Sequence, residues 1–299
     1  MEEVIRIDHL YKDYGDNKGI FDINMSIYKG EMVGFVGTNG SGKTTTIRSI
    51  MGFIKPTSGH AYVLGKESWS HSSEIVKHIG YVPGEIAFPD LKTGTAFLKS
   101  QGEFLHMQDF SYADELIKKL QLDTSANLKR MSKGMKQKTA LVAALMNNAD
   151  IIILDEPTTG LDPLMRDSFL EIIKDEHKKG KTILMSSHIF EELESTCDKV
   201  AFISNGHIID VADMNAIRNR DVIDFKVEFK NSDEYKRFKN EKFKITRKQK
   251  EFNQLTIQVK KNELDGFFKV LNTYQILYFK SEKYTLEKHF KLIMNERNK

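Results

Sequence analysis

The sequence predicts an α/β fold built on a mainly parallel sheet, with a helical insertion and a small α+β domain at its C-terminal end. Three observations lead to this class. From Glu3 to about Asp213, short apolar strands alternate with loops and helix-compatible segments, as in a parallel sheet covered by helices. Between about residues 85 and 149 this pattern gives way to helical periodicity. After about residue 219, Lys- and Phe-rich segments alternate as half-buried strands do.

The first part is expected to form one domain over residues 1–218, with a helical subdomain at about 85–149. Its strands are indicated by short apolar runs at residues 32–36, 151–154 and 182–185. Within the insertion, apolar side chains recur at helical spacing in residues 113–120.

The C-terminal part, residues 219–299, predicts a separate α+β domain with an interaction or regulatory role. Residues 225–230 and 255–259 alternate as half-buried strands, and residues 263–271 and 286–294 have the spacing of short amphipathic helices. The lysine surplus of this part suits an acidic partner, an identical domain or lipid headgroups, and it suits a solvated surface equally well.

The composition is that of a globular protein, with 40% hydrophobic and 29% charged residues. A formal net charge of +3 gives no case for a broad basic surface, so no nucleic-acid partner is expected. Cys197 is the single cysteine, which excludes an internal disulfide framework and fits the cytosol. The charged N-terminus is unlike a secretory signal, and no segment approaches the roughly 20 apolar residues of a membrane span. Any membrane crossing is therefore expected from another chain.

A glycine-rich turn follows the strand at residues 32–36 and precedes a helix-compatible segment. Together with the Thr45 that follows, its residues form the P-loop pattern: Gly37, Thr38, Asn39, Gly40, Ser41, Gly42, Lys43 and Thr44. The glycines let backbone amides converge on phosphate oxygens, and the helix N-terminus adds a favourable dipole. We expect Lys43 to reach the β- and γ-phosphates of ATP and the Thr44 hydroxyl to ligate Mg²⁺.

Two acidic residues at the end of another apolar strand complete the predicted site. Asp155 and Glu156 directly follow residues 151–154. We expect Asp155 to hold Mg²⁺, usually through water, and Glu156 to act as general base on the attacking water. The sequence therefore predicts a protein that binds MgATP and hydrolyses it.

The residues around this acidic pair resemble those of ATP-binding cassette (ABC) proteins. Residues 155–163 resemble the family's Walker B to D-loop passage, and residues 131–138 resemble its signature motif. His188, which follows the strand at 182–185, resembles the switch histidine. The resemblance covers roughly the first 215 residues in order, and it implies a P-loop NTPase cassette with a RecA-like core and a helical subdomain.

The resemblance also implies that two cassettes, identical or different, pair head to tail. Each ATP would then lie between the P-loop of one cassette and the signature motif of the other. Ser132 and the backbone of Gly134 would contact the γ-phosphate across the interface, and Asp162 would touch the partner's site. His188 would hold the γ-phosphate within its own subunit. Hydrolysis would therefore need a dimer.

An aromatic side chain is implied beside the adenine base. Tyr14 stands where the family places such a residue. Tyr11, three residues earlier, is the alternative, unless it packs in the core.

The sequence departs from the family's pattern at three positions. Lys133 and Met135 replace the first glycine and the glutamine of the signature motif. Gly84 stands where the family often has a glutamine that senses Mg²⁺ and reports to the membrane subunit. Glu85 is a candidate substitute for that glutamine.

Within the family, the chain resembles the bacterial exporters that expel drugs, antimicrobial peptides or polysaccharides through a separately encoded membrane subunit. The support is a stand-alone cassette, residues 159–163, and a closing run at 284–290 like the end of that group's C-terminal extension. We therefore expect a peripheral protein on the cytoplasmic face of the membrane, bound to a permease.

Two other classes stay open. A soluble cassette protein of translation or DNA maintenance would usually carry a second cassette, long coiled coils or zinc modules, and none is visible in the sequence. A regulatory module that holds ATP without hydrolysing it disagrees with the presence of Glu156 and His188. An ATPase measurement separates this last class from the others.

Overall fold

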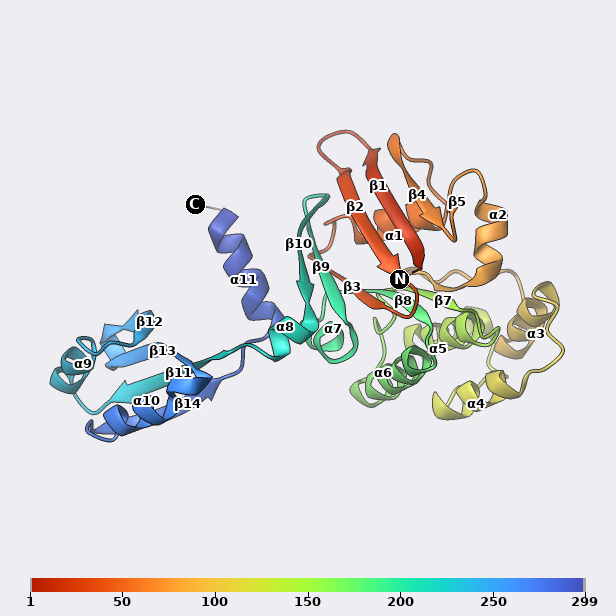
Figure 1. Ribbon diagram of the computed structural model, residues 1–299. Helices are drawn as coiled ribbons and strands as arrows, with labels where there is room; N and C mark the ends of the chain where they lie inside the picture. Colours follow the sequence, from red (N-terminus) through yellow and green to blue (C-terminus); the bar gives the residue numbers. More distant parts are fainter. Residues whose placement is uncertain (1, 298–299) are drawn as a thin grey trace. The chain divides into compact units, whose positions relative to one another are not determined.

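Apolar runs form the central sheet of the computed structural model, which describes residues 2–297 (Figure 1). The six strands are β3 (Met32–Val36), β6 (Ile79–Val82), β7 (Ile151–Asp155), β8 (Thr182–Ser187), β9 (Lys199–Ser204) and β10 (His207–Asp213). Their order is β10-β9-β3-β8-β7-β6, and only the pair of β10 and β9 is antiparallel. β3, β7 and β8 are buried along their whole length, which is typical of a parallel sheet covered on both faces. The predicted α/β class is confirmed.

A second, antiparallel sheet shares the core of the first. Its strands are β1 (Glu3–Asp13), β2 (Gly19–Tyr28), β4 (Ser58–Val63) and β5 (Lys66–Glu67), in the order β2-β1-β4-β5. Ile5 and Ile7 of β1 belong to the same buried cluster as Phe35 of β3 and Ile153 of β7. The sequence pattern alone does not separate this sheet from the parallel one.

Helices cover the sheets of this part of the chain, and no strand lies between β6 and β7. They are α1 (Lys43–Ile50), α2 (Ser72–Ile75), α3 (Gly94–Phe104), α4 (Ser111–Lys119), α5 (Lys133–Leu145), α6 (Pro163–Lys178) and α7 (Phe190–Thr196), and the short helix α8 (Met214–Arg218) follows β10 in the chain. Thr93, Ser132 and Asp162 cap α3, α5 and α6 by accepting a backbone N–H three residues ahead. Among residues 2–297, no helix combines the length and the apolar character that a bilayer crossing requires.

A buried carboxylate of α6 connects the helical insertion to the turn that precedes β8. Glu176 of α6 has no exposed surface. It accepts hydrogen bonds from Tyr112 of α4 at 2.6 Å and from Lys179 at 2.7 Å, and it lies 2.7 Å from the ammonium of Lys181. Burial by itself would raise the pKa of Glu176, but the contacts with Lys179, Lys181 and Tyr112 hold this pKa below its ordinary value.

We expect Glu176→Gln to lower the unfolding free energy of the cassette by about 3 kcal/mol at neutral pH, because it leaves the buried Lys181 without its counter-charge. A carboxylate with a lowered pKa stabilises the fold fully above its unfolded pKa, and this contribution is lost as the pH falls through the folded value. The difference from wild type should therefore shrink in acid. Urea unfolding followed by Trp69 fluorescence measures it, since Trp69 is the chain's single tryptophan. The exposed pair Glu115–Lys119 provides the control, and Glu115→Gln should change stability by less than ~0.5 kcal/mol.

The chain divides into two compact units, Met1–Met214 and Asn215–Lys299, and the second has its own core. Its strands are β11 (Val222–Phe229), β12 (Lys244–Gln249), β13 (Gln254–Lys260) and β14 (Ile276–Glu282), in the antiparallel order β12-β13-β11-β14. Its helices are α9 (Ser232–Phe238), α10 (Leu264–Leu271) and α11 (Leu286–Arg297). Aromatic rings fill the core: Phe225 stacks on Phe267 and Phe229 packs against Phe238, both at 5.1 Å between centroids. The small α+β class predicted here is confirmed.

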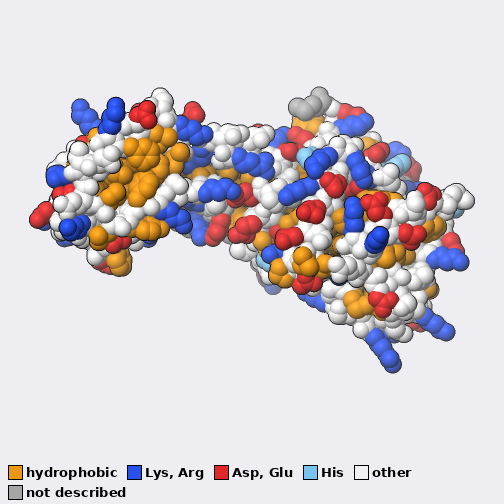
Figure 2. All heavy atoms as spheres, turned by 90° about the horizontal axis from the view of Figure 1, so that it is seen from below, with side chains coloured by type: hydrophobic (Ala, Val, Ile, Leu, Met, Phe, Trp, Pro, Cys, Tyr) orange, Lys and Arg blue, Asp and Glu red, His pale blue; other side chains and the backbone are white. Residues whose placement is uncertain are grey.

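The two edge strands of the sheet in the second unit, β12 and β14, differ in the side chains that they expose. β12 carries Lys244, Arg247 and Lys248, and such charges protect an edge strand from pairing with another strand. β14 instead exposes a continuous apolar run, with Leu277 at 64% exposed and Tyr278 at 45%. Figure 2 shows a hydrophobic patch on the surface of this unit. The edge at β14 is therefore the part of the unit most open to an added strand.

Candidate active site

The loop between β3 and α1 has a backbone that its glycines permit. Gly42, the N-cap of α1, has a φ of +113°, where a residue with a side chain is strained. At Gly37 a Cβ atom would lie 2.2 Å from the carbonyl oxygen of Ile203. No described side chain caps α1 at Gly42. The first amides of the helix are thus free to bind an anion.

A cavity of about 710 Å³ opens over this loop, a volume that suits a small-molecule ligand. Ten of the residues predicted from the sequence line it: Tyr14, Asn39, Gly40, Ser41, Gly42, Lys43, Thr44, Thr45, Glu156 and His188. They come from the turn between β1 and β2, from the glycine-rich loop and α1, and from the ends of β7 and β8. The fold therefore gathers segments far apart in the sequence at one place.

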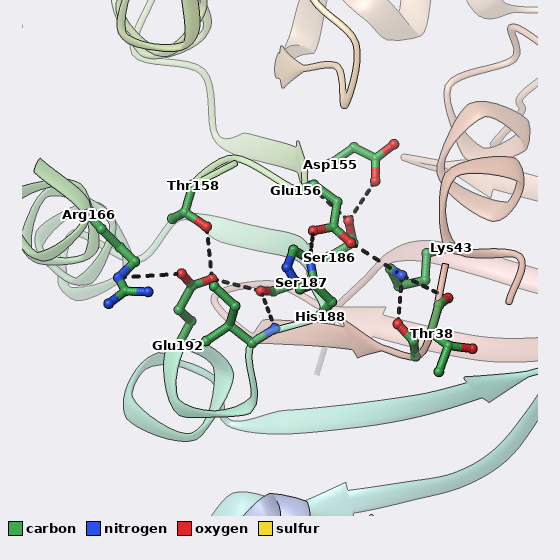
Figure 3. A network of polar contacts seen from close by, with 12 residues as sticks. Thr38, Lys43, Asp155, Glu156, Thr158, Arg166, Ser186, Ser187, His188 and Glu192 are labelled. Atoms are coloured by element: carbon green, nitrogen blue, oxygen red, sulfur yellow. Dashed lines mark hydrogen bonds and ion pairs between the residues drawn. The ribbon is translucent and has the colours of Figure 1, made fainter. Parts of the chain in front are cut away.

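Lys43 lies buried beside the cavity, with 6% of its side chain exposed. Its Nζ donates to the carbonyl oxygens of Gly37 at 2.8 Å and Thr38 at 3.3 Å, and it lies 3.3 Å from Oε1 of Glu156 (Figure 3). Three oxygens thus compensate a charge that has left bulk water. A phosphate entering the cavity would compete with them for the ammonium group.

Glu156 stands between Lys43 and His188. Its Oε2 lies 2.5 Å from Nδ1 of His188, and its backbone N–H donates to the hydroxyl of Ser186 at 3.0 Å (Figure 3). Glu156 has a φ of +51°, which is uncommon for a residue with a side chain and typical of functional sites. The geometry therefore holds one carboxylate between a cation and an imidazole at the cavity wall.

Asp155 has a buried oxygen that is ready for a cation. Its Oδ1 accepts a hydrogen bond from the Ser186 hydroxyl at 2.6 Å, whereas Oδ2 has no hydrogen-bond partner among the described residues. A buried carboxylate oxygen without a partner is unfavourable, and Mg²⁺ or its bound water would satisfy it. Burial raises the pKa of the neighbouring Tyr81 to about 12, and the charge of Asp155 adds to that shift. Asp155 therefore fits a magnesium ion, for which the Thr44 hydroxyl is the other expected ligand.

Gly84 leaves room beside this oxygen. A Cβ atom at Gly84 would lie 3.2 Å from Oδ2 of Asp155, so a side chain here would crowd the place that a metal needs. Glu85 lines the cavity but is exposed. Its role as a substitute for the family's glutamine stays a prediction.

The residues predicted to act on a partner's nucleotide do not line this cavity: Ser132, Gly134 and Asp162. Gly134 closely approaches the segment after Glu156, since a Cβ atom there would lie 2.9 Å from the carbonyl oxygen of Gly160. The side chain of Lys133 covers Gly160 and reaches the cavity. The departure at Lys133 therefore brings a cation to the chain's own site.

Four lining residues are not among those predicted from the sequence: Lys18, Gly19, Arg48 and Thr159. Arg48 could have been found, because it follows Thr44 by one helical turn and so shares its face of α1. Lys18 lies beyond the turn that presents Tyr14, and no local pattern in the sequence indicates that the turn folds over the loop. That placement depends on the pairing of β1 with β2.

Comparisons with known proteins show which family this chain resembles. The family model described as "ABC transporter" matches residues 20–159. The bacitracin transport ATP-binding protein BcrA of Bacillus licheniformis is 33% identical over 77% of this chain and 77% of its own. The linearmycin resistance ATP-binding protein LnrL of Bacillus subtilis is 34% identical over 69% of this chain and 68% of its own. A solved structure titled as the ATP-binding subunit of an ABC transporter superposes with a TM-score of 0.65 at 27% identity, covering 72% of this chain and 92% of the other.

Proposed function

Because this chain belongs to the ABC transporter family as one of its ATP-binding subunits, we propose that it hydrolyses MgATP to drive export through a separate membrane subunit. The observation that carries the proposal is the contact of Glu156 with both Lys43 and His188 at the wall of a nucleotide-sized cavity. A binding module without catalysis has no need of a carboxylate held in this way.

Each residue of the site has a role that its geometry supports. The amides at the start of α1 and the ammonium of Lys43 bind the terminal phosphates. The carboxylate of Glu156 takes a proton from the attacking water, and His188 holds the γ-phosphate from the other side of that carboxylate. Thr44 and Asp155 would hold Mg²⁺, which would supply the charge neutralisation that phosphoryl transfer needs. Tyr14, exposed at the cavity mouth, offers its ring to the adenine base.

Phosphate release by the purified full chain tests this function. We expect release that depends on ATP and stops when EDTA removes magnesium, because phosphoryl transfer relies on the metal for charge neutralisation. Titration with a fluorescent ATP analogue, run in parallel, separates binding from turnover. Binding without magnesium-dependent release would support the regulatory module instead.

The proposal includes a second cassette as partner. Ser132 and Asp162 lie outside the chain's own cavity, and both are exposed at the starts of helices α5 and α6. Leu164, near Asp162, is 67% exposed although it is apolar. These residues are available to a second cassette that approaches head to tail. Each ATP would then lie between Lys43 of one cassette and Ser132 of the other.

A groove next to the nucleotide site is where we expect the permease. Residues 86–90, together with Leu128, Lys129 and Lys136, enclose about 510 Å³. The same loop lines the nucleotide cavity at Gly84 and Glu85, so it connects the groove to the nucleotide cavity within a few residues.

Relatives named for bacitracin transport and linearmycin resistance favour drugs or peptides as cargo. The chain would then work at the cytoplasmic face of the membrane.

The second unit is proposed as an interaction module that takes no part in catalysis. Its core is formed by its own residues, and every residue that lines the nucleotide cavity belongs to Met1–Met214. Deleting residues 221–299 should therefore leave ATP affinity within a few-fold of the full chain while weakening self-association or assembly with the permease. Nucleotide titration, thermal unfolding and co-purification of the two chains measure this. A folded shortened chain that fails to bind ATP would contradict the proposal, as would one that assembles fully.

A further inference from the structure

Glu192 of α7 is a buried carboxylate at the back of the site, with 2% of its surface exposed. Its Oε2 accepts hydrogen bonds from the hydroxyls of Ser187 at 2.7 Å and Thr158 at 3.1 Å (Figure 3). Neither the P-loop nor the acidic pair includes this residue, and it does not line the nucleotide cavity.

The two hydroxyls belong to the segments that carry the reacting groups. Thr158 lies two residues after Glu156, and Ser187 directly precedes His188. Ser187 Oγ also accepts the N–H of Ile189 at 3.0 Å, so the hydrogen bond that Ser187 donates to Glu192 orients a hydroxyl that shapes the turn at His188. One carboxylate oxygen thus ties together the two turns whose side chains, Glu156 and His188, meet at 2.5 Å.

The other oxygen of Glu192 connects to a third segment. Oε1 has no hydrogen-bond partner among the described residues, and Nε of Arg166 lies 4.0 Å away (Figure 3). Arg166 belongs to the first turn of α6, which begins at its cap, Asp162. A buried carboxylate with an unsatisfied oxygen is a weak source of stability, so stability alone does not account for Glu192.

We propose that Glu192 is a positioning residue for ATP hydrolysis. Its carboxylate holds the turns after Glu156 and before His188 in the arrangement in which base and histidine meet, without itself touching the nucleotide. The inference rests on the proposed ATPase function. It adds to that function the contact that fixes the positions of the two turns relative to each other.

Steady-state phosphate release by the full chain tests the inference. Misplacing a catalytic group by about 1 Å lowers rates on the order of 100-fold, so Glu192→Ala should lower kcat by ~10- to 100-fold. KM for ATP should change by less than ~3-fold, because the phosphate-binding loop is untouched. Glu192→Gln keeps an oxygen that accepts both hydroxyls, and it should recover most of kcat.

Glu191 provides a matched control, because it precedes Glu192 on α7 and is exposed. Glu191→Gln should leave kcat and KM unchanged. The double variant Glu192→Ala with His188→Ala should be little slower than His188→Ala alone, since Glu192 acts partly through the histidine. If Glu192→Ala does not fold, Ser187→Ala and Thr158→Val each remove one bond to the same oxygen, and each should lower kcat with KM unchanged.

The outcomes separate this inference from the function on which it rests. A wild-type chain without magnesium-dependent phosphate release would contradict the proposed function itself. A wild-type chain that hydrolyses ATP while folded Glu192→Ala keeps its kcat would overturn the positioning role alone. A loss in Glu192→Ala that multiplies fully with the loss in His188→Ala, or one that appears only in KM, would also overturn it.

Discussion

Glu156→Gln is expected to slow ATP hydrolysis by a factor of ~10² to 10⁴ while ATP still binds, because proton transfer by a positioned base contributes about that much to a rate. Glutamine has the size of glutamate and can keep contacts with His188 and Lys43, but it cannot accept a proton from water at neutral pH. Single-turnover phosphate release measures the chemical step, and nucleotide titration measures the binding.

The same variant should favour a dimer in MgATP, since uncleaved ATP continues to join the two cassettes. Light scattering with and without MgATP detects the change in mass. Exposed Glu191 again gives the control, with turnover expected within about two-fold of wild type. Normal turnover by Glu156→Gln would remove Glu156 as the base. A variant that stays monomeric would count against a homodimer but not against Glu156 as the base, because the natural partner can be a different cassette.

The parts predicted correctly from the sequence are those in which local pattern and burial agree. β3, β7 and β8 are buried at every position, so their unbroken apolar runs identify them. The strand, glycine-rich turn and helix around Gly37 and Gly42 form a local pattern too, because they lie within a few residues of one another. Neither needs knowledge of distant contacts.

The antiparallel sheet of β1, β2, β4 and β5 was not predicted from the sequence, because its buried residues alternate irregularly. The pairing of β1 with β2 shifts register between Ile7 and Leu10, so buried residues do not alternate evenly along β1. In the second unit, β12 and β14 were also missed. β12 is rich in lysine and mostly exposed, and β14 is an exposed edge whose apolar residues follow one another without alternation.

Glu192 could not be predicted from the sequence either, because its contacts are between residues far apart in the chain. Glu192 lies 34 residues after Thr158, and only the packing of α7 against β3, β8 and α6 brings the two side chains to 3.1 Å. The sequence shows a glutamate in a short helix, a position that usually faces solvent. Its burial follows from tertiary structure, which no periodicity in seven helical residues reveals.

Lys43→Ala should have the largest effect on ATP binding of any single change in this chain. Among the described residues that line the nucleotide cavity, Lys43 is the one buried cation. A hydrogen bond to a charged group contributes ~1.5–3 kcal/mol, and Lys43 is placed to make more than one to the terminal phosphates. We therefore expect affinity for MgATP to fall on the order of 100-fold or more.

Lys18→Ala is the matched control, because Lys18 lines the same cavity and is exposed to solvent. Removing this screened charge should change ATP affinity by only a few-fold, since exposed charge pairs contribute at most about 1 kcal/mol. Nucleotide titration of both variants, with thermal unfolding to verify that each is folded, compares the two lysines directly. Unchanged affinity in folded Lys43→Ala would show that the phosphates are held by the backbone amides alone. Equal losses in both variants would mean that net charge in the cavity, rather than the buried position of Lys43, governs binding.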